Sequence, residues 1–442
     1  KGYERSLDYA LDVLDDVKIS SNNLDQKIMK QLLITCLDGK ALFDLCESQE
    51  KLLNLMIESI SCIRDFKNNY INIDDIKIEE KIGNISETQL IRGTILDKTI
   101  DSSTMPRSID NPKILLINES LETMKTKSES EIEITSPEQM SQFLIQENTD
   151  LEIVVKKIVD ADVNVVISRK GVNEFVQESL AQKGIITIRR VKYNDLWWLE
   201  KATGAKTCKD IYKISADEIG HAKKIYEKTI GGDKMIFVEG VNPKSVTLLL
   251  RANSKRYLDE LHRNALNGFK VLKNFIENPF IVFGAGSIEG IIADKIRNHA
   301  PTIETKEQIV LERFANSVEE IPLTLARNIG MNVIDTKTQL RAKFANSSNK
   351  IKWYGVDYNF RKISDMTLSK IIETTSVKQQ VFNTAVEATN MILNIDDVFM
   401  KNQIDNTHCH VDGHVHAHHD GGKSHNHFEQ EGLEQRQMHQ YY

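Results

Sequence analysis

The stretch LLLRANSKRYLDELHRNALNGFKVLKNFIENPFIVFGAGSIEG, residues 248–290, decides the fold of this chain. It runs from an apolar strand into a helix that carries Asp259 and Glu260, and then into a second strand, PFIVF. This strand ends in the turn Gly284-Ala285-Gly286. Because a glycine has no side chain, another group can approach the backbone of such a turn closely. The stretch therefore predicts a strand, a helix and a strand that ends in a close-approach turn.

Length and composition predict a large protein with more than one core. The chain has 442 residues, of which 40% are hydrophobic and 27% are charged, so we expect two or three domains. Its 57 basic and 64 acidic residues give a net charge of −7, and no long basic run is present. We therefore expect no nucleic-acid partner.

Cysteine usage and hydropathy indicate the compartment. The five cysteines are widely spaced and never form a CxxC pair, which favours reduced thiols in the cytoplasm. No apolar run approaches membrane-spanning length and no signal-peptide pattern is present, so we expect no membrane partner. The sequence does not begin with Met, and we interpret Lys1 as an internal start.

Periodicity predicts helices at both ends and a β-rich block at residues 76–250. In that block, Ser136-Pro137-Glu138-Gln139 is a capping box, so a helix should begin at Pro137. Residues 163–167, 172–182 and 185–191 predict a strand, a helix and a strand. Two further strands are expected on either side of an Asn242-Pro243 turn. Adjacent Trp197 and Trp198 point in different directions on a helix, so at most one should be exposed.

A collinear series of motifs from about residue 2 to residue 399 resembles the subunits of group II chaperonins, the archaeal thermosome and its eukaryotic cytosolic relative. The series comprises GYERSLDYALDVL, IMKQLLITCLDGK, the stretch quoted above, LERFANSVEEIPLTLARNIGMNVID, KWYGVDYNFRKISDM and IIETTSVKQQVFNTAVEATNMILNIDDVF. The KWYG stretch favours an archaeal member. The family places a phosphate-cradling glycine loop and a GDGTT segment before the first of these motifs, so we expect that N-terminal equatorial segment to be lacking here.

The resemblance implies an α/β multidomain fold with mostly helical equatorial segments, a small intermediate domain and an α/β apical domain with a helical protrusion. Gly93 and Arg251-Ala252-Asn253 match the two apical hinges. The implied boundaries are equatorial 1–20, intermediate 21–92, apical 93–252, intermediate 253–286, equatorial 287–402 and a disordered His-rich tail 403–442.

The resemblance also implies a nucleotide site for ATP or ADP with Mg. Gly284, Ala285 and Gly286 match the family's triple-glycine turn, with Ala285 crowding its middle position. Glu373 and Lys378 match the residues that line the ribose and base side of the pocket. A second departure is Lys370, which stands where the family usually has glycine.

One substitution affects the chemistry expected at that site. Asp259, Glu260 and Arg263 match the family pattern D-E-x-x-R-x-x-x-D-A, but its second Asp, which helps to activate the attacking water, is Asn267 here. An amide cannot act as a general base at neutral pH. No catalytic residue is therefore assigned, and two hypotheses stay open: active turnover, or residues that persist only to hold the fold.

The tail has a composition of its own. From residue 407 it holds nine of the twelve histidines in a polar, low-complexity context that cannot bury a core. Its HxH spacings could chelate zinc, nickel or copper, but a flexible segment lacks the surrounding groups that orient ligands. We expect no structural metal site, only adventitious binding by His408, His410, His414, His416, His418 and His419.

The expected function is that of a molecular chaperone subunit. The resemblance implies a double ring built with other chaperonin subunits, which binds unfolded polypeptides and encloses them for ATP-dependent folding. The alternative is a hydrolysis-deficient structural and substrate-binding subunit of a hetero-oligomeric ring. The sequence does not define ring size, partner subunits or client specificity.

Overall fold

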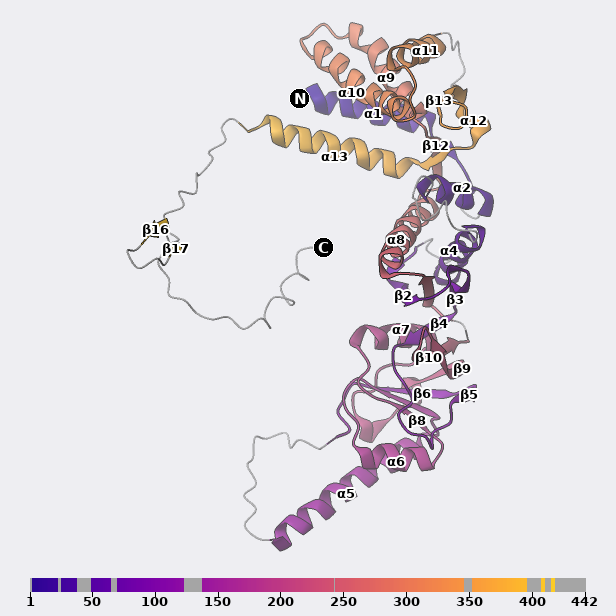
Figure 1. Cartoon of the computed structure of the whole chain (residues 1–442), viewed down its shortest axis with the longest axis vertical. Helices are drawn as coiled ribbons and strands as arrows, with labels where there is room; N and C mark the ends of the chain where they lie inside the picture. The colour runs from indigo at the N-terminus through magenta and orange to yellow at the C-terminus, as the bar shows by residue number, and fades with distance from the viewer. Residues whose placement is uncertain are drawn as a thin grey trace. The chain divides into compact units, whose positions relative to one another are not determined.

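The computed structural model describes residues 2–22, 25–37, 49–64, 70–122, 137–241, 243–345 and 352–395, with two short strands further on, β16 (Thr407–Cys409) and β17 (Val415–Ala417). Only the backbone is described for residues 137–148 and for these two strands. The chain divides into one compact unit of residues Lys1–Val386 and a second of Glu387–Tyr442. Figure 1 shows the chain, with labels on many of the helices and strands of the first unit.

The largest sheet has seven strands in the order β4-β10-β9-β6-β7-β8, with β5 paired to β9. Strands β6, β7 and β8 run parallel, and the other pairs are antiparallel. The strands are β4 (Gly93–Leu96), β5 (Ser108–Asp110), β6 (Lys113–Ile117), β7 (Val165–Ser168), β8 (Ile186–Ile188), β9 (Ile219–Ile230) and β10 (Asp233–Gly240).

Helices cover both faces of this sheet because successive apolar side chains along its strands point to opposite faces. On one face, Ile114 of β6 packs in a cluster with Leu199 of α7 (Tyr193–Thr203). On the other, Leu115 packs with Val154 of α5 (Pro137–Asp160) and Leu180 of α6 (Glu174–Gln182). Two short 3-10 helices, η3 (Ile211–Lys213) and η4 (Ala216–Glu218), precede β9. The predicted helix start at Pro137 is confirmed; Ser136 lies outside the described residues.

A second sheet has the order β2-β11-β3, with β2 (Ile76–Ile82) parallel and β3 (Gln89–Ile91) antiparallel to β11 (Val246–Ala252). Three helices share one apolar cluster with it, in which Leu33, Met56, Leu248 and Phe269 are buried. The helices are α2 (Gln26–Leu37), α4 (Gln49–Ile63) and α8 (Lys255–Glu277), and the 3-10 helices are η1 (Ile73–Asp75) and η2 (Ile85–Glu87).

The third sheet joins β1 (Ile19–Ser20), β12 (Phe280–Phe283) and β15 (Ile372–Thr374), all antiparallel, and a hairpin of β13 (Tyr354–Asp357) and β14 (Lys362–Asp365) lies nearby. A cluster that includes Val282, Ile292, Phe314 and Trp353 forms the core. The surrounding helices are α1 (Gly2–Val17), α9 (Ser287–His299), η5 (Ala300–Thr302), α10 (Glu307–Asn328), α11 (Val333–Ala345), α12 (Met366–Ser369) and α13 (Thr375–Leu393).

The chain crosses between the first two sheets at two places. Gly93 is the first residue of β4, just after β3, and a Cβ there would lie 2.0 Å from the Val238 carbonyl oxygen, so only glycine fits. The second crossing is residues 241–245, between β10 and β11. The two strands predicted around Asn242-Pro243 are present and belong to different sheets, although Asn242 itself is not described.

The sheet pairing bears on the proposed second hinge. Arg251 and Ala252 lie inside β11, and the Arg251 guanidinium donates to the Ile82 carbonyl at 3.0 Å and pairs with Glu87 at 3.1 Å. The domain boundaries stay a prediction. For the predicted apical segment 93–252, this pairing favours an end at residues 241–245 over an end at residue 252.

The clamp formed by Lys77, Asp195, Trp198 and Asp74 joins the first two sheets. Lys77 of β2 donates from Nζ to Asp195 of α7 and to the Ile95 carbonyl, each at 2.6 Å. Trp198 donates from its indole nitrogen to the Asp74 carbonyl at 2.8 Å. Trp197 and Trp198 are both half-buried, and the Lys201 ammonium lies over the Trp197 ring, 3.9 Å from its centroid.

No helix in the described part of the chain is long and apolar enough to cross a membrane.

Candidate nucleotide site

The turn after β12 lies where three separately encoded segments meet. Gly284 donates its backbone N–H to Ile371, and Val356 of β13 donates to the Ala285 carbonyl, at 2.9 and 3.0 Å. Ala285 has a φ of 55° and Gly286 a φ of 77°. A side chain is unfavourable in this left-handed region, by roughly 1–2 kcal/mol. Ala285 is therefore held there by its surroundings.

The glycines of the turn are required because protein atoms occupy the space beside them. A Cβ on Gly284 would lie 2.4 Å from a carboxylate oxygen of Glu373, and one on Gly286 would lie 2.5 Å from Pro322 of α10. Lys370, just before β15, has a φ of 54°, so its position also favours glycine. Ala285 and Lys370, where the resemblance described above implies glycine, thus adopt glycine-like backbone angles.

Glu373 and Lys378 meet in a buried triad with Glu289 of α9. The Lys378 ammonium lies 2.7 Å from Glu289 and 2.8 Å from Glu373. The side chains of Lys378, Glu289 and Glu373 are 12%, 3% and 28% exposed. One Glu289 oxygen, Oε2, is buried without a hydrogen bond in the described structure. The sequence-predicted pair is therefore brought together, but Glu289 was not anticipated.

Burial and neighbouring charges shift the pKa values of Glu373 and Lys378. Burial raises the pKa of Glu373, against the opposing pull of Lys378. Burial works against the ammonium, but the carboxylates of Glu289 and Glu373 outweigh it and raise the pKa of Lys378. Lys378 is therefore charged at neutral pH, and two carboxylates neutralise that charge.

A groove of about 790 Å³ adjoins the turn, between α2 and the β13–β14 hairpin. Ile371, whose carbonyl accepts the bond from Gly284, is part of its wall. The groove is lined by Gln31, Ile34, Thr35, Asp357, Tyr358, Asn359, Phe360, Lys362, Ser364, Asp365, Leu368, Ser369 and Ile371. These residues were not assigned from the sequence, although the motif GVDYNFRKISDM contained most of them.

The hairpin presents aromatic side chains on a turn that the Asp357 carboxylate holds by hydrogen bonds. Asp357 accepts hydrogen bonds from the backbone N–H groups of Asn359 and Phe360 at 3.0 and 3.2 Å. Tyr358 and Phe360 are 71% and 70% exposed, and Lys362 lies over the Phe360 ring, 5.0 Å from its centroid. An exposed ring beside a cation is a surface on which a base can stack.

Asn267 lies on the exposed face of α8. It follows Asp259 and Arg263 at intervals of four residues, so the three side chains share one face of the helix, and all three are exposed. The next residue, Gly268, faces the core, where a Cβ would lie 2.2 Å from Met56. Among the described residues that line the groove, Asn267 does not appear.

The groove fits a nucleotide better than the triad does. Its volume lies within the range of roughly 300–1,000 Å³ typical of ligand pockets, and it combines aromatic, hydroxyl and amide groups. The Lys378 ammonium, in contrast, already has two carboxylate partners. The assignment of Gly284, Ala285, Gly286, Glu373 and Lys378 as cofactor-binding residues stays a prediction.

The histidine-rich tail adds one backbone observation. Strands β16 and β17 pair antiparallel, with His408 opposite His416. The other predicted ligands, His410, His414, His418 and His419, lie outside the described residues.

Comparison with known proteins gives a consistent result. The model of the TCP-1/cpn60 chaperonin family matches residues 1–403. A thermosome subunit of Pyrococcus horikoshii is 36% identical over 409 residues, covering 92% of this chain and 73% of the relative. Thermosome subunit beta of Archaeoglobus fulgidus is 36% identical over 401 residues, covering 90% of this chain and 72% of the relative.

A solved structure is also similar. The open-state monomer of a group II chaperonin from Methanococcoides burtonii has a TM-score of 0.64 and 28% identity, covering 89% of this chain and 92% of that chain.

The fold and the extended match define a molecular chaperone subunit of a ring chaperonin. The chain belongs to the TCP-1/cpn60 chaperonin family. The predicted family and the predicted α/β multidomain chaperonin fold are both confirmed.

Proposed function

We propose that this subunit binds ATP or ADP in the groove between α2 and the β13–β14 hairpin, and that nucleotide drives enclosure of unfolded polypeptides in a cytoplasmic double ring. Other chaperonin subunits complete that ring, and Mg accompanies the nucleotide. The thermosome relatives and the group II chaperonin structure support this function by similarity.

One observation carries the proposal. Segments 31–35, 284–286 and 357–371 are far apart in the sequence, yet the first and last line one groove and the turn is hydrogen-bonded to its wall. A cavity of ligand size whose walls come from separate segments of the chain is a feature of ligand sites.

Different residues of this groove offer different kinds of contact to a nucleotide. Tyr358 and Phe360 offer rings for stacking, while Thr35 and Ser364 offer hydroxyl groups for hydrogen bonds. Bound ATP supplies the phosphoanhydride bond whose cleavage releases free energy for domain movement. Asn267 has no basic group with which to take a proton from water, so we expect slow turnover.

The proposal is tested by nucleotide binding and by refolding. Binding of a fluorescent ATP analogue to the full chain should weaken about tenfold in Phe360→Ala, because stacking contributes about 1–3 kcal/mol per base. Tyr193→Ala, which truncates an aromatic residue 63% exposed at the start of α7, is the matched control. Assembled rings should also refold a denatured client faster with ATP than without it. Unchanged binding in Phe360→Ala together with ATP-independent refolding would overturn the proposal.

A further inference from the structure

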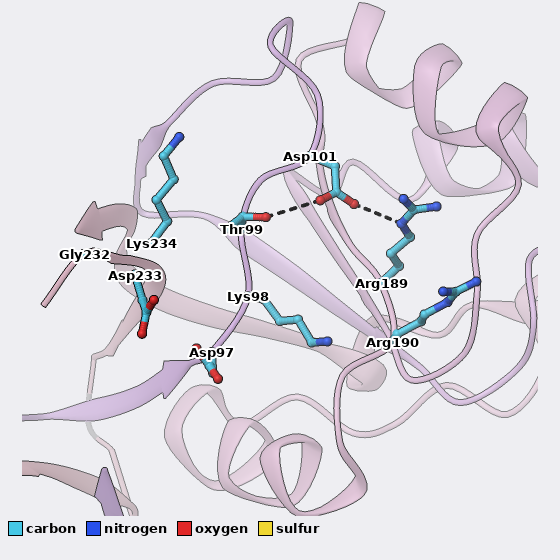
Figure 2. A pocket seen from close by; sticks show the side chains of 9 residues that line it. All are labelled: Asp97, Lys98, Thr99, Asp101, Arg189, Arg190, Gly232, Asp233 and Lys234. Carbon is cyan, nitrogen blue, oxygen red and sulfur yellow. Dashed lines mark hydrogen bonds and ion pairs between the residues drawn. The ribbon is translucent and has the colours of Figure 1, made fainter. Parts of the chain in front are cut away.

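A second cavity, of about 550 Å³, lies beside the seven-stranded sheet and is lined by charged residues, one threonine and one glycine. Three loops form it: residues 97–101 after β4, residues 189–190 after β8 and residues 232–234 at the β9–β10 turn (Figure 2). The lining residues are Asp97, Lys98, Thr99, Asp101, Arg189, Arg190, Gly232, Asp233 and Lys234. Seven of these nine carry charge, and none has an apolar side chain.

The acidic groups of this cavity already have partners. Asp101 accepts a hydrogen bond from Arg189 at 2.9 Å, as the dashed line in Figure 2 shows. Asp97 and Asp233 pair with Lys81 of β2, at 3.4 and 2.8 Å. Their negative charge is therefore largely neutralised, although each carboxylate keeps oxygen lone pairs that can accept further hydrogen bonds.

The remaining basic groups are far less satisfied. Lys98, half-buried, has no hydrogen-bond or ion-pair partner in the described part of the chain. The Arg190 guanidinium is 3.7 Å from Glu122 and its side chain is 70% exposed. The Lys234 ammonium is 4.0 Å from Glu227, which Arg107 approaches more closely at 3.1 Å. The charge that this cavity offers to a ligand is positive.

The backbone at Arg190 is strained where it meets the cavity. Its φ is 55°, in the left-handed region, and its N–H donates to the Lys170 carbonyl at 3.1 Å. Residues in such conformations persist only where the surrounding structure maintains them, and they are frequent at functional sites. The hydrogen bond to Lys170 therefore helps to hold the Arg190 backbone at the cavity.

The lining also limits the class of ligand. A nucleotide base or an acyl chain would find no apolar side chain to contact in this cavity. A phosphate concentrates its negative charge on one small group and would face the like charges of Asp97, Asp101 and Asp233. A polypeptide bears both kinds of group, since its acidic side chains are acceptors and its backbone N–H groups are donors.

We propose that this cavity binds an acidic segment of a polypeptide, with Lys98 and Arg190 contacting its carboxylates and the oxygens of Asp97 and Asp101 accepting from its backbone. The assignment rests on the proposed function, since unfolded polypeptides are the clients of a chaperone. It adds charge-based recognition of sequence to the binding of non-native chains.

Peptide binding to the full chain tests the assignment. The probes are an octapeptide of alternating Glu and Gly and its counterpart with Lys, each with an uncharged fluorophore, followed by fluorescence anisotropy at low salt. The Glu peptide should bind, and Lys98→Gln or Arg190→Asn should each weaken it about fivefold. Asn tolerates a positive φ, so Arg190→Asn removes charge without adding backbone strain. Lys209→Gln, at an exposed lysine outside the cavity, should change nothing.

Three results would overturn the assignment: equal binding of the Lys peptide, unchanged binding in the Lys98→Gln/Arg190→Asn double variant, or displacement of the Glu peptide by inorganic phosphate beyond that by chloride of equal ionic strength. Circular dichroism checks that each variant folds. ATP-dependent refolding of a client without acidic segments is measured separately. If the double variant retains that refolding, a failed peptide assay refutes the cavity assignment and leaves the proposed function standing.

Discussion

Replacing Lys378 with methionine should strongly destabilise the region around β15 and α13. The substitution keeps most of the side-chain volume but removes the cation between Glu289 and Glu373, which lie 2.7 and 2.8 Å away. Removing one partner of a buried ion pair typically costs about 3–5 kcal/mol. The only relief is protonation, which for a carboxyl of unfolded pKa near 4.3 costs about 3.7 kcal/mol at pH 7. We therefore expect a loss of about 3–4 kcal/mol at pH 7.

The sign of the pH dependence follows from Glu373, whose pKa is already raised by burial. A carboxyl with a raised folded pKa favours the folded state fully below its unfolded pKa, and this contribution is lost as pH rises through the folded pKa. In Lys378→Met the opposing effect of the ammonium is gone, so the pKa rises further. The deficit should therefore shrink from pH 7 to pH 5, where protonation costs only about 1 kcal/mol.

Amide hydrogen exchange of β15 and α13, with denaturant unfolding at both pH values, measures this deficit. Lys306→Met, an exposed lysine at the start of α10, is the matched control and should change stability by less than about 0.5 kcal/mol. Lys378→Met/Glu289→Gln should recover part of the loss. A deficit equal at pH 5 and pH 7, or no larger than that of the control, would refute the reasoning.

Three more changes have defined outcomes. Asn267→Asp places a carboxylate at the position to which the chaperonin resemblance assigns water activation, and it should raise ATP turnover of assembled rings by on the order of a hundredfold; an unchanged phosphate-release rate would contradict this. Ala285→Gly should leave thermal stability unchanged or raise it by up to about 1 kcal/mol, because it relieves the strain at φ 55°, and a lower melting temperature would argue against that strain. Lys77→Met removes the cation beside Asp195 and should destabilise the contact of α7 with β2 by about 3 kcal/mol, seen as faster proteolysis between the two sheets; wild-type proteolysis rates would disprove it.

Local signals predicted the elements of this fold well. The helix at residues 172–182 appears as α6 (Glu174–Gln182), and the strand at 163–167 as β7 (Val165–Ser168), each shifted by about two residues as is usual for element ends. Periodicity also predicted helices toward the N-terminal end of the chain, where α4 carries the buried Leu52, Met56 and Ile60. In each case the signal lies within a few neighbouring residues, so no long-range contact is needed to recognise it.

The sequence signals did not predict which distant strands and which distant charged residues pair. Strand β11 follows β10 closely in the sequence but pairs with β2 and β3. Strands β4 to β10 lie between β2 and β11 in the sequence, so no local signal indicates this pairing. The pairing of Lys378 with Glu289 likewise depends on packing of α9 against α13. The motif match located the turn and the two charged residues, but only the fold reveals that their charges neutralise one another.

The clamp of Lys77, Asp195, Trp198 and Asp74 makes movement between the first two sheets a thermally activated step. To separate α7 from β2, the ion pair must pass from a buried position into water while the indole N–H loses its carbonyl acceptor, before new partners are found. An intermediate displacement satisfies neither set of contacts, so two discrete positions are favoured over gradual drift. The time between transitions then depends on the height of this barrier, and a ligand that changes the barrier changes the cycle rate even if it leaves both end positions equally stable.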